Sequence, residues 1–183
     1  MTGLVTPQMK LNSKTRFTGR VIADVRVPDT LTAAYIIATV QHETGGRFVP
    51  VYEKYNGDAV EYFSAKYEHR ADIGNVRPGD GYLYRGRGLV QLTGRALYEK
   101  LGKRLNVPLA DNPDLAMNPD IAYEITIAGM LDGLFTGVAL SRYLSIPIPD
   151  LLNARRVVNG TDKARVIAGY TSEIETALNK VAA

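Results

Sequence analysis

The chain has 183 residues, enough to bury a hydrophobic core in one domain, and its 45% hydrophobic and 22% charged residues are ordinary values for a globular protein. It has no cysteine and only two histidines, which excludes disulfides and thiolate metal sites and argues against a histidine-rich metal centre. The net charge of +3 and the isoelectric point near 9.1 favour an acidic partner such as nucleic acid, an anionic lipid surface or an anionic cell-wall polymer.

The N-terminal residues 1–15 are polar and lack the apolar core of a secretion signal. No apolar run in the sequence reaches the roughly 18–20 residues that a bilayer-spanning helix needs. We therefore expect a soluble protein that is made in a reducing cytoplasm and has no stable membrane insertion.

The chain divides into an N-terminal arm and one larger domain. Residues 1–27 have scattered apolar positions, and the weak alternation over residues 16–27 predicts an extended arm or a short strand of unknown role. Helical signals begin at Pro28-Asp29-Thr30 and continue to the end of the chain. Residues 28–183 are therefore predicted to form a single domain.

Apolar spacings of three and four predict a succession of helices in this domain. In chain order they cover residues 30–43, 58–67, 93–105, 121–134, 140–144, 151–158 and 162–181. Asp29 or Thr30 can cap the first helix, and two glycines end it. Residues 71–81 and 107–119 are predicted as loops because glycines and prolines cluster there. The predicted fold class is mainly α, with long loops and little strand.

Glu43 stands in the last turn of the first predicted helix. Unpaired carbonyl groups at that end carry partial negative charge, which disfavours a carboxylate and favours the protonated carboxyl. A carboxyl that holds its proton near neutral pH is what a general acid needs. The alternative is a solvated glutamate at a frayed helix end, which is the commoner situation for this residue type.

Several common catalytic patterns are absent from the sequence. It has no Gly-x-Ser-x-Gly elbow and no cysteine nucleophile. His42-Glu43 is followed by Thr44-Gly45-Gly46, which does not fit the zinc-binding helix pattern. Gly86-Arg87-Gly88 lacks both the third glycine of a dinucleotide fingerprint and the Lys-Ser/Thr of a phosphate loop. A carboxylate-centred site remains, and we expect no metal and no cofactor.

A glycosidase needs two carboxyl groups that face each other across a sugar. Glu53 lies ten residues after Glu43, past Pro50, in an irregular segment that can fold back opposite the helix end. Glu61 is a weaker candidate because it precedes Tyr62 on a predicted helix. The alternative for each of them is an ordinary solvated glutamate.

The segment 84–94 mixes glycines, arginines and apolar residues. Gly86 and Gly88 flank Arg87 and allow the backbone to approach a ligand or another segment closely. If the segment is extended, Gln91 and Thr93 project from the same side while their apolar neighbours are buried. The alternative is a buried strand with a glycine bulge and exposed arginines.

Six motifs follow one another along the chain. They are His42-Glu43-Thr44-Gly45-Gly46, Pro78-Gly79-Asp80-Gly81, Tyr84-Arg85-Gly86-Arg87-Gly88-Leu89-Val90-Gln91-Leu92-Thr93-Gly94-Arg95, Asn112-Pro113-Asp114-Leu115-Ala116, Asp132-Gly133-Leu134-Phe135-Thr136-Gly137 and Ala154-Arg155-Arg156-Val157-Val158-Asn159-Gly160. In this order they resemble the glycoside hydrolase family 19 domain, and its phage endolysin branch more than the plant chitinases. The similarity covers about residues 28–180.

The resemblance implies a lysozyme-like, mostly helical fold with two lobes around a substrate cleft. It also implies hydrolysis of β-1,4 bonds next to N-acetylhexosamines, with inversion. Carried over by position, Glu43 matches the general acid, Glu53 the general base and Thr93 the Ser or Thr that holds the nucleophilic water. Gln91, Arg156 and Asn159 match cleft-lining positions, and the predicted substrate-binding residues also include His42, Tyr84, Arg87 and Tyr98.

One position departs from the pattern of that branch. Leu97 stands where the phage branch usually has an asparagine after Thr-Gly-Arg-Ala. Because leucine cannot form the hydrogen bonds of an asparagine to water or sugar, the rate and the subsite preference are expected to differ.

Peptidoglycan is the expected substrate, rather than chitin, because the motifs match the phage branch and the chain lacks a secretion signal and plant-type disulfides. Residues 84–104 add six basic side chains against one acid, Glu99, which suits an anionic wall, although an ordinary solvated helix face explains them as well. The basic residues are Arg85, Arg87, Arg95, Lys100, Lys103 and Arg104. The resemblance thus implies a monomeric endolysin for host lysis. It would be made in the cytoplasm of the host bacterium, act on the cell wall in the periplasm and need a holin-type partner to reach it.

Three alternatives stay open from the sequence. The nearest is a chitinase acting on N-acetylglucosamine polymers. A catalytically impaired carbohydrate-binding module on the same scaffold is supported only by Leu97. A nucleic-acid-binding domain is disfavoured because only Tyr84 and Tyr98 interleave with the basic residues and no binding motif occurs, so we expect no nucleic-acid partner.

Overall fold

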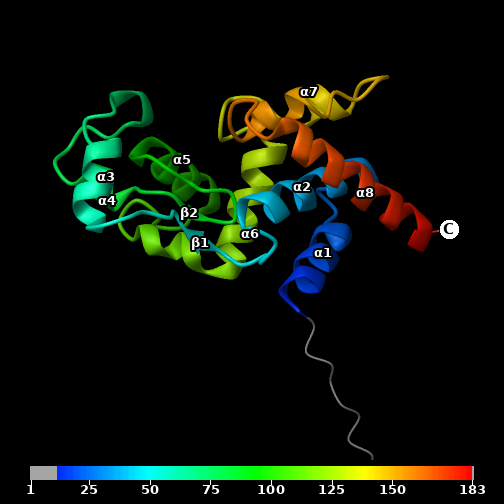
Figure 1. The fold of residues 1–183 in the computed structure, drawn as a ribbon, viewed down its shortest axis with the longest axis horizontal. Helices are drawn as coiled ribbons and strands as arrows, with labels where there is room; N and C mark the ends of the chain where they lie inside the picture. Colours follow the sequence, from blue (N-terminus) through cyan, green and yellow to red (C-terminus); the bar gives the residue numbers. More distant parts are fainter. Residues whose placement is uncertain (1–11, 183) are drawn as a thin grey trace, which may run out of the picture.

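The computed structural model describes residues 12–182 (Figure 1). Its first element is the helix α1 (Ser13–Ala23), which begins where the Asn12 side chain accepts a hydrogen bond from the Thr15 backbone N–H at 2.8 Å. Phe17 and Val21, four residues apart, are both buried against the rest of the domain. The predicted extended arm over residues 16–27 is therefore wrong, because helical spacing and a good N-cap outweigh the weak alternation. Residues 1–11 of that predicted arm lie outside the described part of the chain.

The central element is α2 (Thr30–Glu43), which confirms the first predicted helix. The Asp29 carboxylate accepts from the Thr32 N–H at 2.7 Å and so caps the helix, as predicted. The middle of α2 is buried on all sides, and the long C-terminal helix α8 (Ala164–Ala182) packs along it (Figure 1). This packing fixes the position and direction of the α2 C-terminus, where Glu43 lies.

Two hydrophobic clusters divide the domain into two lobes. The first joins α1, α2 and α8, and the second lies under α5 (Arg95–Leu105) around Leu101 and Leu109. The helix α6 (Pro119–Leu131) belongs to both, because it places Met130 in the first cluster and Ile125 in the second. Figure 1 shows α3, α4 and α5 on one side of α6 and α1, α2 and α8 on the other. The predicted mainly α, two-lobed fold is confirmed.

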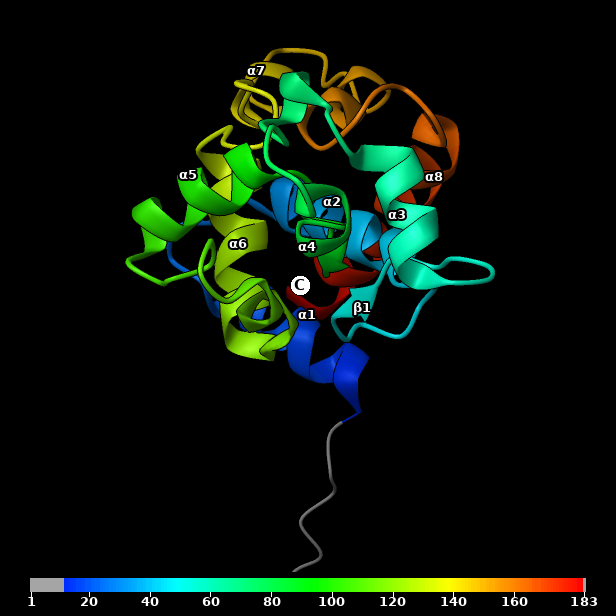
Figure 2. The same cartoon turned by 90° about the vertical axis from the view of Figure 1, so that its left-hand side faces the viewer.

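A small antiparallel sheet lies between the lobes. Its strands are β1 (Val51–Tyr52) and β2 (Arg87–Gly88), in a register that pairs Val51 with Gly88 and Tyr52 with Arg87. Between the two strands the chain forms the helices α3 (Ala59–Tyr67), which follows β1, and α4 (Asp80–Leu83), which precedes β2. In the perpendicular view, α3 and α5 lie on opposite sides with α2 between them (Figure 2). The sheet thus connects the α3 side of the molecule to the segment that leads into α5.

The other elements are short. They are the 3-10 turns η1 (Ala71–Ile73), η2 (Pro113–Met117) and η3 (Asn153–Val157) and the helix α7 (Ser141–Leu144). Each predicted helix of the domain is present with ends shifted by up to three residues, and the predicted loops hold η1, η2 and the start of α4. Among the described helices, none combines the length and the apolar character that crossing a bilayer requires.

Candidate active site

A cleft of about 380 Å³ contains the three predicted catalytic residues. The residues that line it are Glu43, Glu53, Tyr67, Arg70, Ile73, Val90, Gln91, Thr93, Leu97, Val158 and Asn159. They come from the end of α2, the segment after β1, the end of α3, the region of η1, the segment between β2 and α5, the first turn of α5 and the end of η3 with the loop after it. The fold therefore brings two glutamates and a threonine from separate parts of the chain to one cleft.

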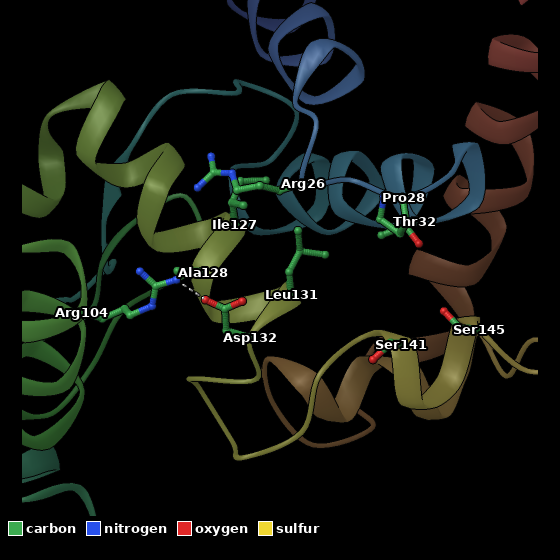
Figure 3. A pocket seen from close by; sticks show the side chains of 10 residues that line it. All are labelled: Arg26, Pro28, Thr32, Arg104, Ile127, Ala128, Leu131, Asp132, Ser141 and Ser145. Carbon is green, nitrogen blue, oxygen red and sulfur yellow. Dashed lines mark hydrogen bonds and ion pairs between the residues drawn. The ribbon is translucent and has the colours of Figure 1, made fainter.

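A second pocket, of about 280 Å³, opens between α5, α6, α7 and the start of α2 (Figure 3). One carboxylate lines this pocket, that of Asp132, and it forms an ion pair with Arg104 at 2.9 Å. Because it holds one carboxylate rather than two, this pocket does not fit a two-carboxylate reaction.

Glu43 is the last residue of α2, as predicted, and the chain then turns through Gly45 and Gly46 with positive φ angles of 58° and 76°. Its side chain is 15% exposed, and Oε1 accepts from Arg155 Nη2 at 2.7 Å. Arg155 is itself 4% exposed and also donates from Nε to the Asp162 carbonyl at 3.2 Å. Arg155 is thus the cation that faces Glu43 at the end of α2. Sequence reasoning missed this arginine.

Glu53 is held by three donors from two segments. Lys66 Nζ lies 2.6 Å from Oε1, and the Tyr67 hydroxyl lies 2.8 Å from Oε1 and 3.0 Å from Oε2. The Gly86 backbone N–H donates to Oε2 at 3.1 Å. Lys66 and Tyr67 were not predicted as site residues, because their approach to Glu53 depends on how α3 packs against the sheet.

Gly86 passes close to this carboxylate. A Cβ atom at this position would lie 2.8 Å from Glu53 Oε2 and 2.6 Å from Gln91 Oε1, closer than a side chain tolerates. The close backbone approach predicted for the glycines around Arg87 is therefore present at Gly86, where the neighbour is the candidate base.

Thr93 and Gln91 both line the cleft, but not on an extended segment. Arg87 and Leu92 exchange backbone hydrogen bonds at 3.1 and 2.8 Å, and the turn that they enclose places Gln91 at a positive φ of 57°. The predicted extended course past Arg87 is thus replaced by a tight hairpin turn. The Thr93 hydroxyl donates to the Gln91 carbonyl at 3.0 Å, so its oxygen lone pairs can accept a hydrogen bond from water.

Three predicted substrate-binding residues are instead packed beneath the hairpin. Tyr84, Arg87 and Tyr98 are at most 2% exposed and do not line the cleft. Arg87 pairs with Asp114 at 2.7 Å and donates to the Leu83 carbonyl at 2.8 Å. Burial raises the pKa of Tyr98 to about 12. The polar groups of all three residues form hydrogen bonds inside the protein, so these side chains stabilise the hairpin rather than contact substrate.

Of the other predicted substrate-binding residues, Gln91 and Asn159 line the cleft, whereas His42 and Arg156 do not. Arg156 is exposed and donates from Nε to Asn153 at 3.0 Å, while its neighbour Arg155 points to Glu43. Leu97 does line the cleft, so the departure from the expected asparagine lies at the candidate site itself.

Arg70 is the cationic member of the cleft lining and was not predicted. Its Nε and Nη2 groups donate to the Asp72 carboxylate at 2.7 and 2.6 Å, and its side chain is 49% exposed. A guanidinium has five N–H donors, so this pairing leaves three of them. Arg70 can therefore offer donors to an anionic ligand in the cleft.

The basic residues of the stretch 84–104 are largely engaged within the protein. Arg87, Arg95 and Arg104 form ion pairs with Asp114, Asp80 and Asp132, respectively. Lys100 donates to the Leu134 carbonyl at 2.7 Å. Within residues 12–182, no group of three or more His, Asp and Glu side chains is placed to hold a metal ion.

The chain resembles one known protein over part of its sequence and several solved structures in its fold. No family model matches the chain. A 61-residue segment is 36% identical to a glycosyl hydrolase family 19 domain-containing protein of Haemophilus influenzae, and it covers 33% of this chain and 30% of that protein. The match thus spans less than a third of that relative's length.

The fold is shared with solved chitinase structures. Chitinase C from Streptomyces griseus superposes with a TM-score of 0.62 at 21% sequence identity, over 91% of this chain and 67% of that chain. A bacterial family 19 chitinase superposes with a TM-score of 0.52 at 20% identity, over 90% of this chain and 82% of that chain. These likenesses confirm the fold that the sequence motifs implied.

Proposed function

We propose that this chain belongs to glycoside hydrolase family 19 and that it hydrolyses β-1,4-glycosidic bonds of bacterial peptidoglycan by an inverting two-carboxylate mechanism. The observation that carries the proposal is the single cleft lined by Glu43, Glu53 and Thr93. Two carboxyl groups on one sugar-sized cleft are the minimal machinery of an inverting glycosidase.

In the proposed reaction, Glu43 gives its proton to the leaving glycosidic oxygen. Because Arg155 occupies Oε1 of Glu43, we assign the transferred proton to Oε2. Glu53 takes a proton from a water molecule whose oxygen attacks the anomeric carbon from the opposite face, while the C–O bond to the leaving sugar breaks. The Thr93 hydroxyl accepts a hydrogen bond from that water. The two carboxyl groups are expected to lie about 6.5–9.5 Å apart, which leaves room for the water.

The choice of peptidoglycan rests on the resemblance of the motifs to the phage branch and on charge. Arg70 gives the cleft a cationic group with three N–H donors beyond those used by Asp72. Peptide stems on peptidoglycan carry carboxylates, whereas chitin is neutral. The basic stretch 84–104 adds less support, since most of its charges are already paired within the protein.

Chitin is the second candidate substrate, favoured by the chitinases among the structural neighbours. The test is release of reducing ends from purified sacculi and from chitin oligomers by the same preparation, with Glu43→Gln as the inactive control. We expect sacculi to be cleaved at least about tenfold faster. Cleavage of chitin oligomers alone would make the chain a chitinase, and binding without cleavage of either polymer would favour the carbohydrate-binding module.

The proposal extends to the biological setting. The chain is then a monomeric phage endolysin that is made in the host cytoplasm and reaches the wall with a holin-type partner. Expression in a bacterial host with and without a membrane-permeabilising protein tests this role. Lysis is expected only when both are present, and lysis by the chain alone would show that it needs no such partner.

A further inference from the structure

The candidate base Glu53 has nearly all of its acceptor capacity occupied. A carboxylate offers about four lone-pair sites. Lys66 uses one on Oε1, Gly86 uses one on Oε2, and the single Tyr67 proton is shared between both oxygens at 2.8 and 3.0 Å. Three donors thus serve four sites. One lone pair remains, and the shorter Tyr67 contact to Oε1 places it on Oε2.

The two side-chain donors are consecutive residues at the end of α3. The Lys66 ammonium lies 5.7 Å from the centre of the Tyr62 ring and 5.1 Å from that of Tyr67, which steadies it beside Glu53. Contact with Glu53 raises the pKa of Lys66 above its ordinary range. Burial, followed by the contact with Glu53, raises the pKa of Tyr67 to about 12. Both residues therefore keep their protons and remain donors at neutral pH.

We propose that Lys66 and Tyr67 are positioning residues that stabilise the ionised Glu53 carboxylate and leave Oε2 as the oxygen that receives the proton of the attacking water. The assignment of Glu53 as the base rests on the proposed function. The three groups that hold Glu53, here called the clamp, are the Lys66 ammonium, the Tyr67 hydroxyl and the Gly86 N–H. The clamp rests on their hydrogen bonds to Glu53 and on the close approach of the Gly86 backbone, which a side chain would displace.

The charge of Lys66 sets the expected direction of the effect. The groups that face Glu53 are Lys66 and Tyr67 from α3 and the Gly86 N–H, and Glu43 and Arg70 line the same cleft. Removing the ammonium takes away the nearest positive charge from a carboxyl that is only 15% exposed, so protonation of Glu53 becomes easier. The titration midpoint of its carboxyl should then move to higher pH.

The test titrates the Glu53 side-chain carboxyl by ¹³C NMR in the full-length wild type, Lys66→Met, Lys66→Arg and Tyr67→Phe. Lys66→Met should raise the midpoint by about one unit, and Tyr67→Phe should move it in the same direction. Lys66→Arg keeps the positive charge and should leave the midpoint near its wild-type value. Lys54→Met is the matched control, because it removes the same charge from an exposed lysine outside the cleft lining. An unchanged midpoint in Lys66→Met, or an equal shift in Lys54→Met, would overturn the clamp.

The kinetic part of the test uses the pH profile of kcat/KM on peptidoglycan. If the pKa that governs the acid limb rises by one unit in Lys66→Met, kcat/KM falls about tenfold at pH values below that pKa. KM should stay near the wild-type value. A merely structural role of Lys66 would lower activity at every pH and reduce the melting temperature. If the wild type does not cleave the wall, the proposed function fails, while the NMR midpoints still decide whether the clamp exists.

Discussion

Arg155 Nη2 lies 2.7 Å from Glu43 Oε1 and joins the turn η3 to the end of α2 across more than one hundred residues of chain. Arg155 is almost fully buried, and its Nη1 group has no hydrogen-bond partner within the described protein. The candidate general acid is therefore also the main counter-charge of a buried arginine, which couples catalysis and stability at this residue.

Replacement of Glu43 should separate these two roles. Glu43→Gln removes the transferable proton but keeps an oxygen for Arg155, so it should lower kcat at least about 100-fold and the free energy of unfolding by only about 1 kcal/mol. Glu43→Ala leaves the buried guanidinium without its counter-charge and should cost about 3 kcal/mol. Urea denaturation measures the difference. Equal stability of the two variants would show that the ion pair contributes little, and wall lysis by Glu43→Gln would refute its role as the acid.

Thr93 is expected to act through its hydroxyl alone. Thr93→Val keeps the shape of the side chain but removes the acceptor for water, and it should lower kcat about tenfold with little change in KM, the effect of one hydrogen bond. Thr93→Ser keeps the hydroxyl and should retain most of the activity. If both variants lose the same activity on peptidoglycan, the water contact is not the reason that Thr93 matters.

Gly86 should tolerate no side chain. Gly86→Ala places a Cβ 2.8 Å from Glu53 Oε2 and 2.6 Å from Gln91 Oε1, so the base or the hairpin must shift. Because a misplacement of about 1 Å can cost roughly 100-fold in rate, activity should fall by that order. Gly160→Ala is the control, since a Cβ there meets nothing within 4 Å. Wild-type activity in Gly86→Ala would mean that Glu53 is not held where the structure places it.

The stability of the domain should fall in acid through Asp24. Hydrogen bonds from Arg26, with further contributions from Tyr123, hold the pKa of Asp24 far below its ordinary range near 4. A carboxyl with a lowered folded-state pKa contributes stability that is complete above about pH 4 and is lost as the pH falls below it. Asp24→Asn should therefore lower the free energy of unfolding at pH 7 and by less at pH 3. An equal loss at both pH values would contradict this assignment.

Asp24→Asn also probes α1 and the residues after it, the segment for which the sequence-based prediction was wrong. Asp24 follows α1 and contacts Arg26 and Tyr123, which ties the end of α1 to α6. The α1 helix was missed because its apolar positions are few, and only the packing of Phe17 and Val21 makes its helical face evident. The helices that were predicted correctly have local signals, such as the Asp29 and Asp58 caps, that need no knowledge of the tertiary fold.

The site could be predicted from sequence only where motif order carries the information. Glu43 and Glu53 were candidates from their positions in the sequence, the motif order gave them and Thr93 catalytic roles, and all three line one cleft. Lys66 and Arg155 could not be found, because each reaches its glutamate through contacts between distant segments. Tyr84, Arg87 and Tyr98 were predicted to bind substrate, but the folded hairpin buries all three, and that burial is a property of the tertiary structure.

The product anomer tests the central claim most directly. During cleavage of peptidoglycan by the wild type, ¹H NMR of the new reducing ends, recorded before mutarotation, should show the α-anomer first. Inversion at a β-1,4 bond requires this outcome, with Glu53 activating a water opposite the leaving group. If the β-anomer appears first, or if no new reducing end forms, the inverting mechanism at Glu43 and Glu53 is contradicted.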